Sequence, residues 1–296
     1  MAFEQKRRTA LKGIFAGAAT ITATGMLSSI EACAQMAETA NQLKGNINHA
    51  VCRWCFNEMS LEELCAAAKA IGIKGIDLVG PKDWPVLQKY GLESTMCNGA
   101  EIGLAEGWNT TKYHATLLKN YTEMIPLVAK AGYKNLICFS GNRNGMDDET
   151  GLQNCTEGLK KLLPVAEKHK VTLVMELLNS KVNHKDYQCD KTAWGVELAK
   201  RLGSENFKLL YDIYHMQIDE GNVIQTIRDS HPYIAHYHTA GVPGRNEIDD
   251  SQELYYPAIM KAIKETGFKG YVAQEFMPLQ PDKMASLRKA VQICDV

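Results

Sequence analysis

The sequence lacks a charge imbalance, and it lacks the glycine-rich loops that bind phosphates. Its formal net charge is -1 over 296 residues, with 33 Lys and Arg against 34 Asp and Glu. A protein that binds nucleic acid through the phosphate backbone needs an excess of Lys and Arg, so this balance argues against nucleic acid as the partner. No G-x-G-x-x-G follows an apolar run and no Walker-type loop occurs, which argues against nucleotide binding. We therefore expect a small-molecule site.

The N-terminal apolar stretch is too short for a typical membrane span. It covers residues 14–30, whereas a spanning helix needs about 20 apolar residues. Basic residues at 6–8 (KRR) precede it and Ala32-Cys33-Ala34 follows it, an order typical of an export signal with a small-x-small cleavage site. The Arg pair resembles a twin-arginine signal.

We expect residues 1–34 to be a twin-arginine-type signal peptide and 35–48 a linker, with the protein exported to the periplasm. After signal removal no transmembrane segment is expected. An uncleaved membrane anchor is the alternative interpretation, and lipid anchoring at Cys33 stays open.

Regular cysteine spacing is also missing. The nine cysteines form no disulfide framework that the spacing would reveal. Cys52 and Cys55 have C-x-x-C spacing, which is compatible with redox or metal chemistry. However, the stretch HAVCRWCF resembles a strand, in which positions three apart face opposite sides. We therefore expect Cys52 and Cys55 to be buried free thiols.

From His49 onward, short apolar runs alternate with amphipathic segments. Amphipathic segments at 60–71, 112–131, 192–202 and 254–266 end near a glycine, which suits a helix end with positive φ. The average spacing between strand starts is about 32 residues, the length of a strand plus a covering helix. The eight candidate strands are 49–56, 73–79, 92–97, 134–139, 171–178, 206–213, 233–239 and 270–276.

Eight βα units predict an α/β fold, a (β/α)8 TIM barrel, as a single domain over residues 49–296. An open doubly wound sheet is the alternative. In a barrel the active site lies at the carboxyl ends of the strands, so the residues at those positions carry information about function.

The last four candidate strands each carry a metal-type or acid-base residue near the carboxyl end. These residues are Glu176, Asp212, His238 and Glu275. If the strands are parallel neighbours, the four side chains converge on one mouth. Three carboxylates with one imidazole suit Mn²⁺, Mg²⁺ or Co²⁺ better than a structural zinc. Each residue taken singly could instead cap a helix or pair with a cation, but the four together predict a divalent metal site.

The order Glu, Asp-x-x-His, His, Glu on the last four strands resembles the xylose-isomerase-like superfamily of sugar isomerases and epimerases. The stretches MELLNSKVNHKDY, YDIYHMQ, HYHTAGVPGRNEID and QEFMP are most similar to hydroxypyruvate-isomerase-type proteins. The resemblance covers residues 49–296. It implies that Glu176, Asp212, His238 and Glu275 hold the metal, and that His215 and Arg245 bind substrate oxygens.

The implied activity is isomerisation of a small hydroxy-carbonyl compound, such as hydroxypyruvate to tartronate semialdehyde, through an enediolate. A divalent cation would stabilise the enediolate, and Glu176 and Glu275 would act as general base and acid. Arg245 offers a planar fork for a carboxylate, which favours an acid substrate.

Other interpretations remain open from the sequence. A ketose 3-epimerase or sugar-acid isomerase would use the same set, although 3-epimerases of this superfamily tend to carry a Glu where Val182 stands. A hydrolytic metal enzyme on the same barrel would need more His and Asp ligands and a basic groove. A non-catalytic periplasmic sugar-binding barrel would bind a ligand but exchange no protons. A homo-oligomer is also left open.

Several polar residues are weaker candidates for the pocket. Asp77 could line it, and the long polar loop 179–190 could form part of a lid. Trp54 could form a wall, although a strand-one aromatic is more often core. We expect His236, two residues before His238 on the same strand face, to be structural.

Overall fold

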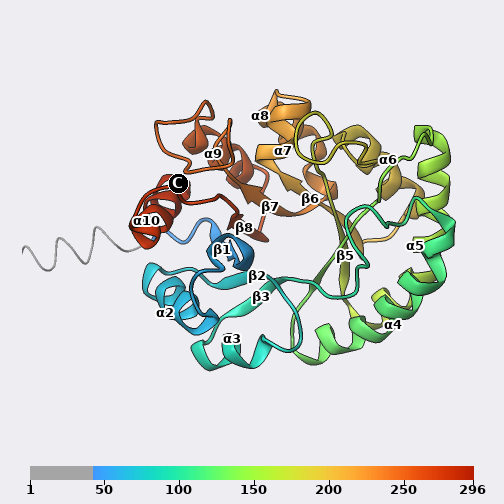
Figure 1. The fold of residues 1–296 in the computed structure, drawn as a ribbon, viewed down its shortest axis with the longest axis horizontal. Helices are drawn as coiled ribbons and strands as arrows, with labels where there is room; N and C mark the ends of the chain where they lie inside the picture. The colour runs from blue at the N-terminus through green and yellow to red at the C-terminus, as the bar shows by residue number, and fades with distance from the viewer. Residues whose placement is uncertain (1–42) are drawn as a thin grey trace, which may run out of the picture. The chain divides into compact units, whose positions relative to one another are not determined.

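Eight parallel strands close into a barrel in the computed structural model, which describes residues 43–296 (Figure 1). The order of strands around the barrel is their order in the sequence, and β8 pairs with β1 to close it. The predicted TIM barrel is confirmed. The strands are β1 (Asn48–Cys52), β2 (Gly75–Val79), β3 (Glu93–Cys97), β4 (Asn135–Cys138), β5 (Thr172–Glu176), β6 (Phe207–Asp212), β7 (Ile234–Thr239) and β8 (Tyr271–Gln274).

The helices surround this barrel (Figure 1). None of the helices in residues 43–296 combines the length and the apolar character that crossing a membrane requires. The predicted signal peptide at 1–34, including Cys33, lies outside the described residues. The helices are α2 (Leu61–Ile71), α3 (Trp84–Tyr90), α4 (His114–Lys130), α5 (Asp148–His169), α6 (Thr192–Leu202), α7 (Ile213–Asp219), α8 (Val223–Ser230), α9 (Tyr256–Glu265) and α10 (Lys283–Cys294), with short 3-10 turns η1 (Arg53–Phe56), η2 (Thr111–Tyr113) and η3 (His231–Tyr233).

Helix α2 ends at a glycine with positive φ, as its sequence predicted. Ser60 caps α2 through a capping box with Glu63, and Gly72 ends it at φ +92° while its N–H donates to the carbonyls of Ala68 and Lys69. A residue with a Cβ rarely adopts that φ, so the glycine fixes where the chain turns into β2.

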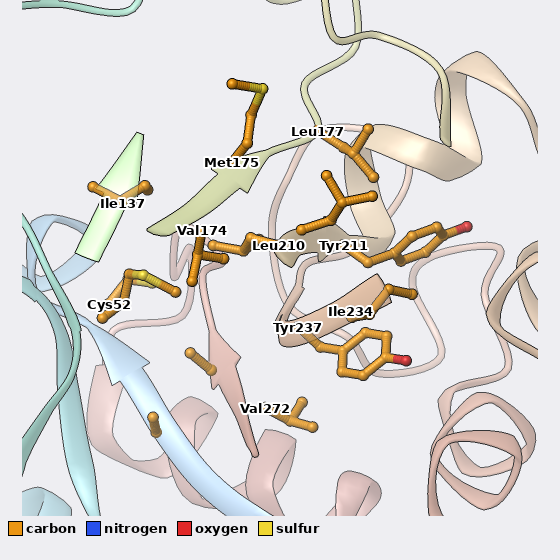
Figure 2. Close-up of a cluster of buried hydrophobic side chains, with 14 of the residues drawn as sticks. Cys52, Ile137, Val174, Met175, Leu177, Leu210, Tyr211, Ile234, Tyr237 and Val272 are labelled. Carbon is orange, nitrogen blue, oxygen red and sulfur yellow. The ribbon is translucent and has the colours of Figure 1, made fainter. Parts of the chain in front are cut away.

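The residues just before the polar strand ends are apolar and fully buried. Met175 precedes Glu176, Tyr211 precedes Asp212 and Tyr237 precedes His238, and each of the three apolar side chains is 0% exposed. Figure 2 shows these side chains in the buried cluster that also contains Val174 and Leu210. Burial of the Met175 side chain stabilises the fold by roughly 1.5–3 kcal/mol. The polar ends therefore project from a rigid apolar scaffold.

The first predicted strand, 49–56, is wrong in its second half. β1 ends at Cys52, and the next four residues form η1. The Arg53 guanidinium donates to the carbonyls of Phe56 (2.6 Å) and Met59 (2.8 Å), which stabilises the turn. Cys55 therefore does not lie on a strand, but the prediction of buried free thiols at Cys52 and Cys55 is confirmed.

Candidate metal centre

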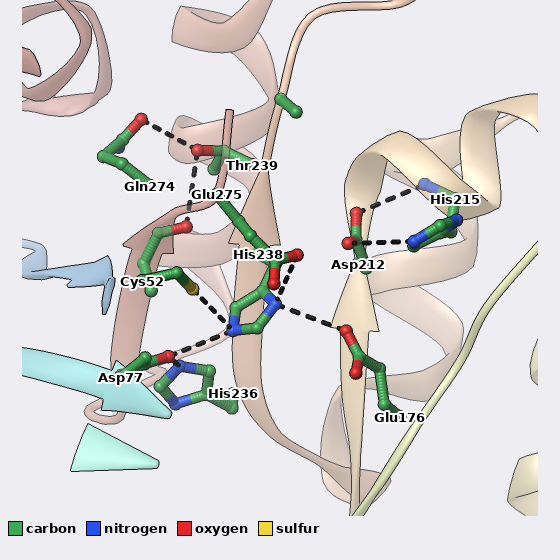
Figure 3. Close-up of polar contacts among 12 residues, drawn as sticks. Cys52, Asp77, Glu176, Asp212, His215, His236, His238, Thr239, Gln274 and Glu275 are labelled. Carbon is green, nitrogen blue, oxygen red and sulfur yellow. Dashed lines mark hydrogen bonds and ion pairs between the residues drawn. The ribbon is translucent and has the colours of Figure 1, made fainter. Parts of the chain in front are cut away.

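Four acid-base side chains gather at the carboxyl end of the barrel. Glu176 and Asp212 are the last residues of β5 and β6, His238 lies on β7, and Glu275 follows β8 directly. Each of the four offers a ligand atom, and these atoms all lie within 4.8 Å of one another (Figure 3). Asp212 and His238 are register partners on neighbouring strands, so the ladder itself brings them together. The structure thus places the four predicted ligand residues side by side.

The His238 ring separates two groups of partners. Its Nδ1 faces Glu275 Oε2 at 2.9 Å and Glu176 Oε1 at 3.4 Å. Its Nε2 faces Asp77 Oδ2 at 3.0 Å and Cys52 Sγ at 3.6 Å. Figure 3 shows the glutamates on one side of the ring and Asp77 with Cys52 on the other. Nδ1 is therefore the nitrogen that belongs to the four-residue set.

Asp212 has two structural tasks. Its Oδ1 accepts a hydrogen bond from the His215 backbone N–H at 3.2 Å, which caps α7. Its Oδ2 lies 3.6 Å from His215 Nε2 and 3.5 Å from Arg245 Nη2. The sequence allowed either a helix cap or a ligand at Asp212, and the carboxylate has one oxygen for each.

Burial and neighbouring charges differentiate the three carboxyl groups of the set. Burial raises the pKa of Glu176 and of Asp212, and the charge of Glu275 raises both further. Burial also opposes ionisation of Glu275, but His238 and Arg245 more than offset it and hold the pKa of Glu275 well below its usual range. Negative charge therefore concentrates on Glu275.

The two predicted substrate-binding residues border the set. Arg245 Nη2 donates to Glu275 Oε2 at 2.5 Å, and its guanidinium lies 5.0 Å from the Trp54 ring centroid and 5.3 Å from that of Tyr214. His215 Nδ1 lies 2.5 Å from Asn179 Nδ2. Because the Asn179 amide can only donate there, Nδ1 is the acceptor and Nε2 carries the hydrogen.

His215 and Arg245 each have a buried N–H group without a hydrogen-bond partner in the described part of the chain. Among the described residues, neither His215 Nε2 nor Arg245 Nε has a hydrogen-bond partner. Burial, and then the charge of Arg245, lower the pKa of His215 well below its usual range, so the imidazole is neutral. Buried unpaired donors are costly, and a ligand oxygen bound beside the four-residue set would pair these two.

Comparison with known proteins agrees with the fold. The sequence profile of the family described as xylose isomerase-like TIM barrel matches residues 65–292. The chain belongs to this family.

Proteins with similar sequences include several that are named as isomerases. A putative hydroxypyruvate isomerase of Homo sapiens is 30% identical over 122 residues, which make up 41% of this chain and 44% of that protein. This chain therefore matches less than half the length of that relative. A 2-oxo-tetronate isomerase of Pectobacterium atrosepticum is 24% identical over 229 residues, 74% of this chain and 86% of that protein. The solved structure titled AP endonuclease, family 2, from Brucella melitensis has a TM-score of 0.73 at 22% identity, covers 81% of this chain and 97% of its own, and shows the shared fold.

Sequence reasoning underrated two residues of this xylose isomerase-like barrel. Trp54, on η1, donates its Nε1–H to Glu275 Oε1 at 2.8 Å and forms a wall beside Arg245. Asp77, on β2, is fully buried against His236 and His238. Burial alone would raise the pKa of Asp77, but the two imidazoles hold it at about 2. The sequence signal for Asp77 is a carboxylate in the middle of an apolar strand (GIDLV), because a buried carboxylate needs a partner.

The loop 179–190 is fixed to the body of the barrel rather than freely solvated. Asp219 at the end of α7 accepts a hydrogen bond from the Ser180 N–H at 2.9 Å. The loop also brings the His184 ring to 5.1 Å from the His215 ring, measured between centroids. Asn179, at the start of this loop, is a further residue whose role the sequence did not indicate.

The donor set fits a divalent cation. Carboxylate oxygens with a single imidazole are ligands of Mn²⁺, Mg²⁺ and Co²⁺ sites, and four ligand atoms around one ion at about 2.0–2.2 Å lie within some 4.4 Å of each other. The observed limit of 4.8 Å needs only small side-chain movements to reach that geometry. Glu176, Asp212, His238 and Glu275 would hold the ion.

Proposed function

We propose that this barrel is a divalent-metal-dependent isomerase of a small hydroxy-carbonyl compound, with hydroxypyruvate as the first substrate to test. The observation that carries the proposal is that two buried glutamates, Glu176 and Glu275, share one cluster with Asp212 and His238 at the barrel mouth. Such an isomerisation removes a proton beside a carbonyl group and returns it to the neighbouring carbon, and carboxylates perform both transfers.

The two glutamates have environments suited to different parts of this task. The raised pKa of Glu176 brings its carboxyl group closer to neutral pH, where a general base works best. Glu275 is held ionised and fixed in orientation by Trp54 and Arg245. We assign proton transfer to both glutamates, with Glu176 as the first acceptor.

His215 and Arg245 supply donors for substrate oxygens. Their unpartnered groups, Nε2 and Nε, border the cluster and are buried. A bound divalent cation adds Lewis-acid polarisation of neighbouring carbonyl and hydroxyl oxygens. A carboxylate on the substrate, as a hydroxy acid carries, would supply acceptors for both donors.

The choice of substrate class rests on the relatives and on one side chain. Two of the relatives are named for isomerisation of hydroxypyruvate and of 2-oxo-tetronate, both small oxo acids. Val182 is 59% exposed and offers no carboxylate to hold additional sugar hydroxyls. Both points favour an acid isomerase over a ketose 3-epimerase.

The decisive experiment follows proton exchange. The protein is stripped with a chelator, reloaded with Mn²⁺, Mg²⁺ or Co²⁺, and incubated in D₂O with hydroxypyruvate, 2-oxo-tetronate and a panel of ketoses. We expect metal-dependent deuterium uptake at the carbon next to the carbonyl, with the product identified by NMR. An epimerised ketose would replace the isomerase assignment by the epimerase one. Ligand binding without exchange would overturn the catalytic proposal in favour of a sugar-binding barrel.

We further propose that the protein is exported by the twin-arginine route to the periplasm. The support is the sequence alone, namely the Arg7-Arg8 pair before the apolar stretch and the small residues at 32–34. Replacing both arginines by lysine should leave the full-length precursor in the cytoplasm, whereas the unaltered chain should appear shortened in the periplasmic fraction. Equal fractionation of the two forms would contradict this route.

A further inference from the structure

A second polar cluster lies inside the barrel, on the far side of the His238 ring from the two glutamates. Asp77 Oδ2 is 2.5 Å from His236 Nε2 and 3.0 Å from His238 Nε2, and the Thr95 hydroxyl donates to Oδ1. All four side chains are buried. Asp77 lies on β2 and the two histidines on β7, strands that are not neighbours, so the carboxylate reaches across the barrel interior (Figure 3).

The distances identify this cluster as hydrogen-bonded rather than as a second metal site. Asp77, His236 and His238 are residue types that can share an ion. Ligand atoms held about 2.0–2.2 Å from one ion stand about 3 Å or more apart, because the angles between them are about 90° or larger. The contact of 2.5 Å between Asp77 and His236 is shorter than that and is a direct hydrogen-bond contact between the carboxylate and the imidazole.

A competition for the ring hydrogen of His238 follows from this arrangement. On the Nδ1 side, Glu275 Oε2 at 2.9 Å is an acceptor that would draw the hydrogen to the nitrogen needed for a metal. On the Nε2 side, the Asp77 carboxylate is the competing acceptor at 3.0 Å. A carboxylate without a proton can only accept, so each of the two contacts requires a hydrogen on the nitrogen that faces it. A metal on Nδ1 would replace the hydrogen shared with Glu275, whereas Asp77 would keep the one on Nε2.

We propose that Asp77 is a positioning residue that keeps the hydrogen of His238 on Nε2 and thereby presents the Nδ1 lone pair to the metal. His236 and Thr95 occupy the other acceptor positions of the same carboxylate and fix its rotation. A carboxylate behind a metal-binding imidazole sets the tautomer and the orientation of the ring, and its loss typically costs 10- to 100-fold in metal affinity. The inference rests on the proposed metal-dependent function.

The test measures metal affinity, independently of turnover. Asp77→Leu keeps the branched shape of the side chain but removes the acceptor, and Asp77→Asn keeps a neutral acceptor. Ser94→Ala is the matched control, because Ser94 on the neighbouring strand β3 is also buried and its hydroxyl donates to the Val79 carbonyl at 3.1 Å. Each full-chain protein is stripped and titrated with Co²⁺, followed by visible absorption and calorimetry.

The expected result is a Co²⁺ dissociation constant raised about 10- to 100-fold in Asp77→Leu, raised less in Asp77→Asn, and within about threefold of wild type in Ser94→Ala. Equal affinity of wild type and a folded Asp77→Leu protein would overturn the positioning role while leaving the isomerase proposal intact. If wild type binds no divalent cation, both proposals fail.

A second measurement needs no variant and decides the question if Asp77→Leu does not fold. Histidine nitrogen NMR of the zinc-loaded wild-type protein should show His238 metal-bound at Nδ1, with a downfield Nε2–H proton characteristic of a hydrogen bond to a carboxylate. Zinc on Nε2, or an Nε2–H in free exchange with solvent, would overturn the proposal.

Discussion

The two halves of the barrel differ in what stands at the carboxyl ends of their strands. β1, β3 and β4 end in Cys52, Cys97 and Cys138, and β2 ends in Val79. In the second half, β5 and β6 end in Glu176 and Asp212. At the barrel mouth, the strands of the first half therefore end in apolar and thiol side chains, whereas β5 and β6 of the second half end in carboxylates.

The first half contributes by holding residues of the second. Trp54 donates to Glu275, and Asp77 accepts from His236 and His238. This division places the reacting groups at the carboxyl ends of β5 to β8 and their supports on η1 after β1 and on β2. Changes in the second half should abolish chemistry, whereas changes in the first half should weaken it or affect only stability.

The largest effect is expected from the glutamates of the second half. Glu176→Gln and Glu275→Gln keep the side-chain shape but remove the proton-transfer group, so the turnover rate should fall by about 10²- to 10⁴-fold. Deuterium uptake in D₂O measures the loss. Glu157→Gln is the matched control, because Glu157 lies exposed on α5 and pairs only with Lys161 in the structure as described. A glutamine variant with wild-type exchange would remove that residue from the reaction.

Metal removal should produce the next largest effect. A cation present at 100 times its dissociation constant stabilises the fold by about 2.7 kcal/mol, a rise in melting temperature of about 5–10 °C for a domain of this size. Asp212→Asn retains an oxygen to cap α7 but loses a charged ligand. Differential scanning calorimetry should show most of the metal-dependent rise disappear in this variant. An undiminished rise would mean that Asp212 is only a cap.

A pH effect is expected in the first half, away from the mouth. Burial lowers the pKa of His49, on β1, from 6.5 to about 4, and the Asp295 carboxylate reverses only part of the shift. The unfolded chain then binds one more proton between about pH 6.5 and pH 4, so the free energy of unfolding falls as the pH is lowered through that window, by about 2 kcal/mol at pH 5.

Urea unfolding at pH 7.5 and pH 5 measures this contribution. His49→Gln cannot titrate, so the loss of stability between the two pH values should be smaller in the variant by about 2 kcal/mol. An identical pH dependence in both proteins would show that His49 is not held neutral.

The smallest effect is expected from a support in the first half. Trp54→Phe keeps the aromatic wall beside Arg245 but removes the 2.8 Å hydrogen bond to Glu275, a charged acceptor. The loss of about 1.5 kcal/mol corresponds to roughly tenfold in kcat/KM. Trp84→Phe is the control, because the Trp84 Nε1–H donates to the Val79 carbonyl and should affect stability rather than turnover. Equal losses in both variants would argue against a role for Trp54 at the site.

The sequence by itself determined the periodic features of this protein. Eight apolar runs at regular spacing predicted the barrel, because a strand buried on both faces needs continuous hydrophobic residues and each covering helix needs a similar length. Polar residues at the ends of the last four runs predicted the cluster of Glu176, Asp212, His238 and Glu275, since parallel strands bring their carboxyl ends to one mouth.

Only the tertiary structure decided the contacts between residues far apart in the sequence, whether across the barrel or where β8 closes on β1. Asp77 and His238 are 161 residues apart, and Trp54 and Glu275 are 221 residues apart. Periodicity gives the face on which a side chain lies but not its partner on a strand that is distant in the sequence. The turn at η1 was missed for a different reason. The Arg53 side chain stabilises it through the carbonyls of Phe56 and Met59, and strand periodicity does not record such local side-chain contacts. Strand pattern is local information, whereas a partner across a closed barrel depends on strand stagger and side-chain packing.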